Sequence, residues 1–271
     1  MHERIETAVV LAAGRGTRMQ RRDDSAHLTP EQARAADSGS KAMIPVGRPM
    51  LDYILSALAD AGIRRACIVI RAGDDEIPAH YARAGVTRLE LVYAEQSGSR
   101  GTADAILSAR EAVGNRPFLM LNGDNYYPVS LMRSLAGFGA PAVAAFDRAA
   151  LIRESNIAED RIRAYALLKV AADGTLEDII EKPDPTLIEA LGASAPVSMN
   201  LWAFPPAMFD ACARVKPSPR GELELQDAVR LLIANGEHFR LLATTAGVLD
   251  LSNRGDIPVV TERLRTVDVQ L

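Results

Sequence analysis

The feature that most constrains the fold of this chain is a short apolar run that ends in a glycine-rich turn. Residues 5–13, which include TAVVLAA, are compact, mostly apolar and rich in valine, and Gly14 follows them directly. A run of this length and content is typical of a strand buried in a parallel sheet. The opening of the chain therefore predicts a parallel β-strand that delivers a glycine-rich loop.

Further strands alternate with helices after this opening. Apolar residues recur at helical spacing over 51–61, and Gly62 ends the pattern. The remaining segments are predicted as strands at 66–70, 89–94 and 117–121 and as helices at 76–84 and 102–113. This rhythm indicates a parallel α/β sheet with right-handed crossovers, and ligands bind such sheets at the carboxyl ends of their strands.

The second half of the chain predicts a mixed or antiparallel extension that carries a second substrate. Short polar turns separate expected strands at 141–146, 165–171, 176–180 and 197–204. An apolar stripe over 225–233 predicts a helix that Gly236 ends, and a terminal helix is expected near 256–267. Residues 20–40 are polar and are interpreted as a long loop, either a functional lid or a disordered segment, and its position between two candidate phosphate-binding motifs favours a lid.

Composition excludes several classes of protein. The chain has 271 residues, 48% of them hydrophobic and 24% charged, which suits one folded domain. Its net charge of −4 gives no field that attracts nucleic acid. No apolar run approaches the roughly 20 residues that span a bilayer, and the N-terminus has no signal-peptide core. We therefore expect a cytoplasmic protein with no membrane partner.

The glycine-rich segment LAAGRGTRM is a candidate phosphate-binding loop. Gly14 and Gly16 let the backbone approach a phosphate closely, and Arg15 and Arg18 can add charge-assisted hydrogen bonds. A dinucleotide-binding turn is excluded because the third glycine and the acidic end of the second strand are missing, and no P-loop motif occurs.

With Lys41 in KAMIPVGRPML, this segment resembles the signature opening of the sugar-1-phosphate nucleotidyltransferases. The resemblance continues in order through most of the chain. Ala94–Gln96 with Gly101–Ala105 resembles the segment that binds the nucleobase, and Leu121–Asp124 resembles the strand end that carries a metal ligand. Glu181–Pro183 resembles the sugar-phosphate motif, and Val197–Trp202 the strand that lines the sugar pocket. Pro217–Glu224 resembles a stretch of glucose-1-phosphate thymidylyltransferases, and Val248–Asp250 lies where the family has its second metal ligand.

The resemblance implies the fold of the nucleotide-diphospho-sugar transferases. This fold is an α/β, three-layer, Rossmann-like sandwich with a mixed, mostly parallel central sheet. The chain is then one catalytic domain over 1–271. Within it, 1–140 form the nucleotide-binding half, 141–255 the sugar-phosphate-binding half and 256–271 a C-terminal helix. Homo-oligomers are also expected from the resemblance.

The implied reaction joins an NMP unit from an NTP to a sugar 1-phosphate and releases pyrophosphate. The nucleophile is already ionised near neutral pH, so positioning, cations and a metal suffice. The resemblance assigns Mg²⁺ to Asp124 and Asp250, and two carboxylates suit that ion. The implied catalytic residues are Arg15, Lys41, Asp124 and Lys182.

The resemblance also assigns residues to the two substrates. Nucleotide binding falls to Leu11, Ala13, Gly14, Gly16, Thr17, Arg18, Gln96, Gly101 and Thr102, and sugar-phosphate binding to Asn122, Ala166, Glu181, Lys182, Asn200 and Arg220. A Gln amide suits the imide edge of a pyrimidine, which favours UTP or dTTP. Asn200 and Ala166 stand where the thymidylyltransferases carry glycine, so the identity of the sugar stays open.

Three other readings remain. A nucleotide-sugar glycosyltransferase can share such a sheet, but it usually binds its metal through an Asp-x-Asp pair, and Asn125 and Tyr126 follow Asp124 here. A non-catalytic regulatory relative is expected to have lost Lys41, Asp124 or Asp250. Transfer to a non-sugar phosphate is disfavoured by the EKP and PRGE segments.

Overall fold

The computed structural model describes residues 4–23, 25–184, 186, 188, 192 and 195–271. Its central sheet has the strand order β10-β6-β9-β4-β1-β2-β3. These strands are β1 (Thr7–Leu11), β2 (Arg65–Arg71), β3 (Glu90–Gln96), β4 (Phe118–Asn122), β6 (Ala142–Phe146), β9 (Val197–Phe204) and β10 (Arg240–Thr244). The sheet is mixed and mostly parallel, because β9 alone on this path runs antiparallel to its neighbours β4 and β6.

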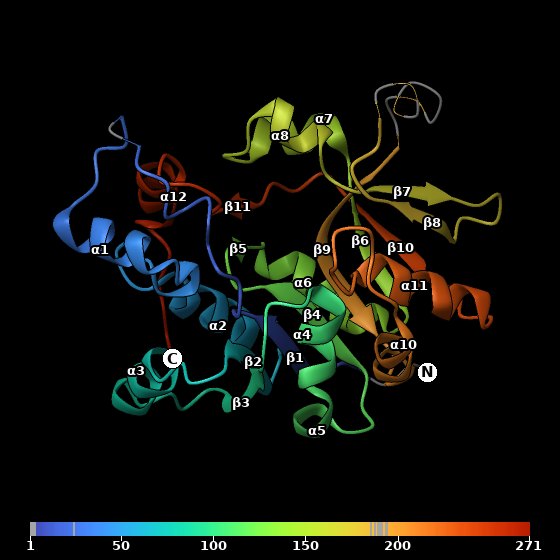
Figure 1. Cartoon of the computed structure of the whole chain (residues 1–271), viewed down its shortest axis with the longest axis horizontal. Coiled ribbons are helices and arrows are strands. Elements are labelled where there is room, and N and C mark those ends of the chain that lie inside the picture. The colour runs from blue at the N-terminus through green and yellow to red at the C-terminus, as the bar shows by residue number, and fades with distance from the viewer. Residues whose placement is uncertain (1–3, 24, 185, 187, 189–191, 193–194) are drawn as a thin grey trace.

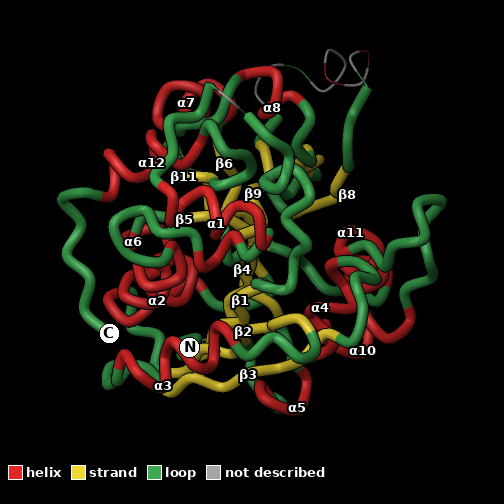
Figure 2. Tube along the Cα trace, turned by 60° about the vertical axis from the view of Figure 1, so that its left-hand side comes forward, coloured by secondary structure: helices red, strands yellow, loops and turns green. Residues whose placement is uncertain are grey.

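Helices cover both faces of the sheet, which gives three layers (Figures 1 and 2). On one face lie α2 (Met50–Asp60), α3 (Glu76–Ala84), α6 (Val129–Phe138) and α12 (Asp256–Leu264), and on the other α4 (Thr102–Ser108), α5 (Arg110–Val113), α10 (Ala207–Arg214) and α11 (Leu225–Ala234). Successive β1 side chains divide between the two apolar cores, with Ala8 and Val10 in one and Val9 in the other. That alternation explains the continuous apolar run at the start of the chain.

Smaller strands and helices lie around the central sheet. The hairpin β7 (Leu167–Val170) and β8 (Leu176–Ile180) joins the sheet through β9, and β5 (Asn125–Tyr126) pairs antiparallel with β11 (Leu249–Asp250). The helices α7 (Arg148–Glu154) and α8 (Glu159–Arg163) lie together at one end of the molecule (Figure 1). None of the described helices is long and apolar enough to cross a membrane.

The predicted strands and most predicted helices are confirmed, with two corrections. The expected single helix over 102–113 is two helices, α4 and α5, separated at Ala109, whose N–H bonds to the Ile106 carbonyl at 3.0 Å. The expected loop over 20–40 contains α1 (Pro30–Ser38). The helices α6, α7, α8 and α10 were not predicted from the sequence.

Helix α1 has local signals that explain why it forms in a polar segment. Thr29 caps its first turn and forms a capping box with Gln32, Pro30 occupies the first turn, and Gly39 ends the helix in the left-handed region. The 3₁₀ helix Lys41–Met43 follows at once. The segment between the glycine-rich loop and Lys41 is therefore ordered by caps rather than by an apolar stripe.

Candidate active site

The main pocket lies at the carboxyl ends of β1 and β4 and has a volume of about 540 Å³. These two strands are parallel neighbours, with Leu11 paired to Asn122. The Gly123 N–H donates to the Leu11 carbonyl at 2.8 Å, and a Cβ on Gly123 would lie 3.0 Å from the same oxygen. The glycine thus lets the two strand ends converge, which is where an open α/β sheet binds its ligand.

The loop after β1 presents free backbone donors to this pocket. The N–H groups of residues 14–17 donate to no other described residue. Gly16 has φ +60°, and a Cβ there would lie 2.3 Å from the Gly39 carbonyl oxygen. Consecutive free N–H groups form a concave anion site. We call residues 14–17 the amide nest.

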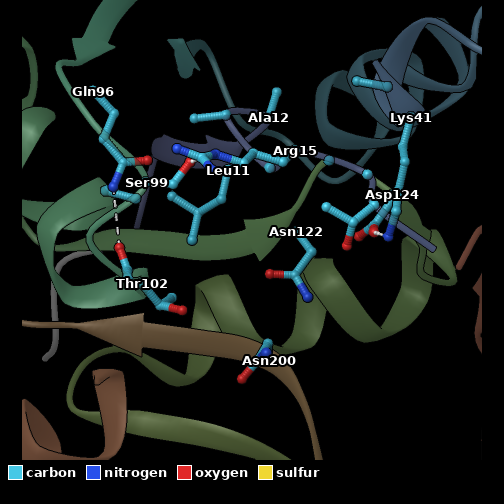
Figure 3. Close-up of a pocket in the computed structure, with 18 of the residues that line it drawn as sticks. Leu11, Ala12, Arg15, Lys41, Gln96, Ser99, Thr102, Asn122, Asp124 and Asn200 are labelled. Atoms are coloured by element: carbon cyan, nitrogen blue, oxygen red, sulfur yellow. Dashed lines mark hydrogen bonds and ion pairs between the residues drawn. The ribbon is translucent and has the colours of Figure 1, made fainter. Parts of the chain in front are cut away.

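Two arginines flank the amide nest, and both line the pocket. The Arg15 Nε donates to the Ser99 hydroxyl at 2.9 Å, across the pocket from its own loop (Figure 3). Arg18 lies close enough to Lys41 for its charge to oppose protonation of that amine. The nest is therefore surrounded by positive charge.

Lys41 and Asp124 face each other in the same pocket. The Lys41 Nζ lies 2.6 Å from the Asp124 Oδ2, and each side chain is 22% exposed (Figure 3). Burial opposes charge on the amine, but the carboxylates of Asp124 and Asp250 outweigh burial and raise the pKa of Lys41. A permanently charged lysine beside a carboxylate at the strand ends suits phosphate and metal chemistry.

Asp250 lies next to Asp124 but does not line the main pocket. The Leu251 N–H donates to the Asp124 carbonyl oxygen at 2.9 Å, which holds the two segments together. The Asp250 carboxylate accepts from the Asn125 amide at 2.8 Å and forms an ion pair with Arg161. Burial and the charge of Asp124 raise the pKa of Asp250, against the influence of Arg161.

At the opposite end of the pocket, Gln96 and Gly101 lie together. The Gln96 amide donates to the Gly101 carbonyl at 3.1 Å. The glycine at 101 has a packing reason of its own. A Cβ at Gly101 would lie 2.4 Å from the Leu223 carbonyl oxygen, so the glycine admits the loop over 217–224.

Asn200 lines the pocket from β9 and has φ +56°. This left-handed conformation favours glycine, and asparagine tolerates it better than most residues. The pairing of β9 with β6 shifts register at this point, between Val143 and Ala145. An asparagine at the position where the resemblance implies glycine is therefore compatible with the backbone, and it adds an amide to the pocket.

Three of the predicted sugar-phosphate residues line a second cavity of about 900 Å³. These are Glu181, Lys182 and Arg220, and the cavity also contains Arg214 and Lys216. Gln226 donates to the Glu181 carboxylate at 2.9 Å, and Arg220 forms an ion pair with Glu224 at 2.8 Å. Glu222, which belongs to the same loop as Arg220, lines the main pocket. The loop over 217–224 thus separates the two cavities.

The structure brings most of the predicted residues together, but not all. The main pocket contains Leu11, Ala13, Gly14, Arg15, Gly16, Thr17, Arg18, Lys41, Gln96, Gly101, Thr102, Asn122, Asp124 and Asn200. Ala166 lies outside it and is buried in the apolar core. Sequence reasoning missed Ser99 and Glu222, which line the pocket, and Arg161, which holds Asp250. Glu222 belongs to the PRGE segment, in which only Arg220 was given a role. No local pattern marks Ser99 or Arg161, because each contacts the site only through the fold.

The comparisons with known proteins agree with this geometry. Residues 7–247 match the family model described as nucleotidyl transferase. The chain belongs to the nucleotidyl transferase family. Like its relatives, it is identified as a nucleotidyltransferase, an enzyme class that transfers nucleotidyl groups.

Two relatives illustrate the range of the family. The chain is 28% identical to a UTP–glucose-1-phosphate uridylyltransferase of Haloferax volcanii, over 97% of this chain and 98% of that protein. It is 30% identical to a glucose-1-phosphate thymidylyltransferase of Streptomyces griseus, over 92% of this chain but 63% of that protein. It therefore spans about two thirds of the length of the second relative.

Solved structures support the fold. A UDP-glucose pyrophosphorylase complexed with UDP-glucose superposes with a TM-score of 0.73 at 18% identity, over 97% of this chain and 100% of that one. A putative glucose-1-phosphate thymidylyltransferase of Bacillus anthracis gives a TM-score of 0.71 at 17% identity, over 98% of each chain. The predicted fold, a three-layer nucleotide-diphospho-sugar transferase sandwich, is thereby confirmed.

Proposed function

We propose that this nucleotidyltransferase joins the NMP unit of UTP or dTTP to a sugar 1-phosphate and releases pyrophosphate. The observation that carries the proposal is the amide nest, flanked by Arg15 and Arg18 and facing Lys41 and Asp124 in one pocket. Free N–H groups and cations stabilise the charge that develops on a triphosphate during phosphoryl transfer. Full-length similarity to a uridylyltransferase supports the pyrimidine nucleotide.

Asp124 and Asp250 fit a Mg²⁺ ion by their chemistry. Both supply carboxylate oxygens from adjoining segments of the chain. Burial and the charge of Asp124 raise the pKa of Asp250, which shows that the two carboxylates repel each other. A divalent cation bound between them would relieve that repulsion. When bound, Mg²⁺ would neutralise phosphate charge and orient the triphosphate. Lys41 would then exchange its carboxylate partner for the phosphates, while Arg15 would help the pyrophosphate to leave.

The sugar 1-phosphate would bind at the border between the two cavities. Lys182 and Arg220 supply cations there, Glu181 supplies an acceptor for a sugar hydroxyl, and Asn200 reaches the main pocket from β9. In this proposal 1–140 bind the nucleotide, 141–255 bind the sugar phosphate, and 256–271 close the domain.

The test is pyrophosphate release from purified enzyme with Mg²⁺, across the common NTPs and dNTPs and several sugar 1-phosphates. We expect a signal that needs both substrates and is largest with UTP or dTTP. An alcohol phosphate is included as a further acceptor, and a signal with it but with none of the sugar 1-phosphates would indicate transfer to a non-sugar acceptor. Absence of any signal from folded protein that binds Mg²⁺–UTP would contradict the proposal and favour a regulatory relative.

A further inference from the structure

The side chain of Gln96 is held in one of its two amide orientations. Its Nε2 donates to the Gly101 carbonyl at 3.1 Å and to the Asp104 Oδ2 at 2.9 Å. A backbone carbonyl and an ionised carboxylate can only accept hydrogen bonds, so the NH₂ group must face both of them. Turning the amide over would set its oxygen against two oxygens in a buried place, since Gln96 is 7% exposed.

Arg100 binds the other oxygen of the Asp104 carboxylate. Its Nη2 donates to the Asp104 Oδ1 at 2.7 Å, and the side chain of Asp104 is only 6% exposed. Both carboxylate oxygens of Asp104 are thereby engaged, one by Arg100 and one by Gln96. The guanidinium holds the carboxylate in place, and the carboxylate holds the amide.

The Oε1 of Gln96 is the atom left for a ligand. It accepts no hydrogen bond from the described residues, and Gln96 lines the main pocket. Figure 3 shows this oxygen directed toward Ser99 and the other side chains that line the pocket, while the amide nitrogen makes the dashed bond. The pocket therefore offers an acceptor here, and a base with a hydrogen on the facing ring nitrogen pairs with it.

Resting on the proposed function, we infer that Asp104 and Arg100 are positioning residues that set base selectivity by locking Gln96 with its oxygen toward the nucleobase. Uracil and thymine carry a hydrogen on N3, whereas the N3 of cytosine is an acceptor. A buried acceptor facing another acceptor leaves both unpaired, and sites built on such a hydrogen bond reject the wrong partner strongly. With Gln96 held in this orientation, the site accepts UTP or dTTP and rejects CTP.

The test measures the dissociation constants of UTP and CTP with Mg²⁺ by calorimetry, in the absence of sugar phosphate. For the wild-type protein we expect UTP to bind roughly tenfold or more tightly than CTP. In Asp104→Asn the new amide can keep its oxygen toward Arg100 and turn its nitrogen toward Gln96, so only the Gly101 carbonyl then opposes turning the Gln96 amide over. The ratio of the two constants should then fall toward one, mostly through tighter binding of CTP.

Asp210→Asn is the matched control, because Asp210 accepts from Arg110 at 2.7 Å in an exposed pair between α5 and α10. It should leave the ratio unchanged. Asp104 is buried, so its variant can lose stability. A second measurement therefore uses wild-type protein with UTP methylated on N3, which has lost the hydrogen and should bind as weakly as CTP.

The outcomes separate this inference from the proposed function. Equal affinity for UTP and CTP, or an unchanged ratio in folded Asp104→Asn, would overturn the inference even if pyrophosphate release with a sugar 1-phosphate persists. Failure to bind any NTP would remove the proposed function and the inference together.

Discussion

Asp124 is the residue on which the proposed chemistry depends most. It lies two residues after the end of β4, forms an ion pair with Lys41, and its charge raises the pKa of the neighbouring Asp250. Its position at a strand end was predictable, because an apolar run of strand length precedes it. The ion pair with Lys41 was not, since 83 residues separate the two in the chain.

Asp124→Asn should lower turnover by a factor of about 10² or more while the protein stays folded, because it removes half of the negative charge that would hold the metal. Steady-state pyrophosphate release and thermal unfolding measure the two effects. Asp60→Asn is the control, since Asp60 pairs with Arg88 at an exposed position. Turnover near the wild-type value would remove Asp124 from the site.

Asn200 allows a test of backbone conformation. Because its φ is +56°, Asn200→Gly should change the free energy of unfolding by less than about 1 kcal/mol, whereas Asn200→Val should lower it by about 1–2 kcal/mol. Urea unfolding of both variants measures the difference. Equal stability of the two would show that the left-handed conformation is not required there.

Lys182 is expected to act on one substrate only. Because Lys182 lines the second cavity and not the main pocket, Lys182→Ala should raise KM for the sugar 1-phosphate about tenfold or more and leave KM for the NTP nearly unchanged. Initial rates with each substrate varied in turn measure the two constants. A similar rise in both constants would place Lys182 elsewhere in the mechanism.

At the scale of elements, helix α1 supports the amide nest rather than standing apart from it. Its C-terminal Gly39 contacts Gly16 so closely that neither position has room for a side chain. The guanidinium of Arg254, 7% exposed, donates to the Met19 carbonyl at 3.0 Å and forms an ion pair with Asp37 of α1. One buried arginine thus connects the chain just after the nest, α1 and the turn after Asp250.

Arg254→Lys tests this connection. A lysine keeps the charge but cannot reach both partners, so the nest should lose its fixed position. We expect KM for the NTP to rise about tenfold and KM for the sugar phosphate to stay near its wild-type value. Arg263→Lys is the matched control, because Arg263 also donates to two backbone carbonyls, those of Glu154 and Ser155, and contacts neither α1 nor the chain after the nest. Equal changes in the two variants would contradict the role of Arg254.

The elements differ in how far the sequence predicts them. The strands at the centre of the sheet, such as β1 and β4, were predicted because each is buried on both faces and therefore reads as a continuous apolar run. Helix α1 was missed because its signals are caps, Thr29 with Gln32 and Gly39, and the segment between them is polar. The division of α4 from α5 at Ala109 has no breaker residue, so nothing in the sequence marks it.

At the scale of the whole molecule, the central sheet brings the residues of the site together. The parallel strands β1, β2, β3 and β4 end at one edge, and the antiparallel strand β9 brings Asn200 to the same pocket. Residues that follow strands were therefore predicted as a group from their order in the chain. Arg161, Arg254 and Asp104 were not, because their contacts depend on how α8, the turn before α12, and α4 pack against that edge.

The central claim is that this fold exchanges pyrophosphate for a sugar phosphate on a nucleotide. The most direct measurement runs the reaction in reverse, with UDP-glucose or dTDP-glucose, pyrophosphate and Mg²⁺, and follows nucleotides by chromatography. We predict formation of UTP or dTTP together with glucose 1-phosphate, and no such products without pyrophosphate. Release of UDP or dTDP with transfer of the sugar, independent of pyrophosphate, would contradict this account and indicate a glycosyltransferase.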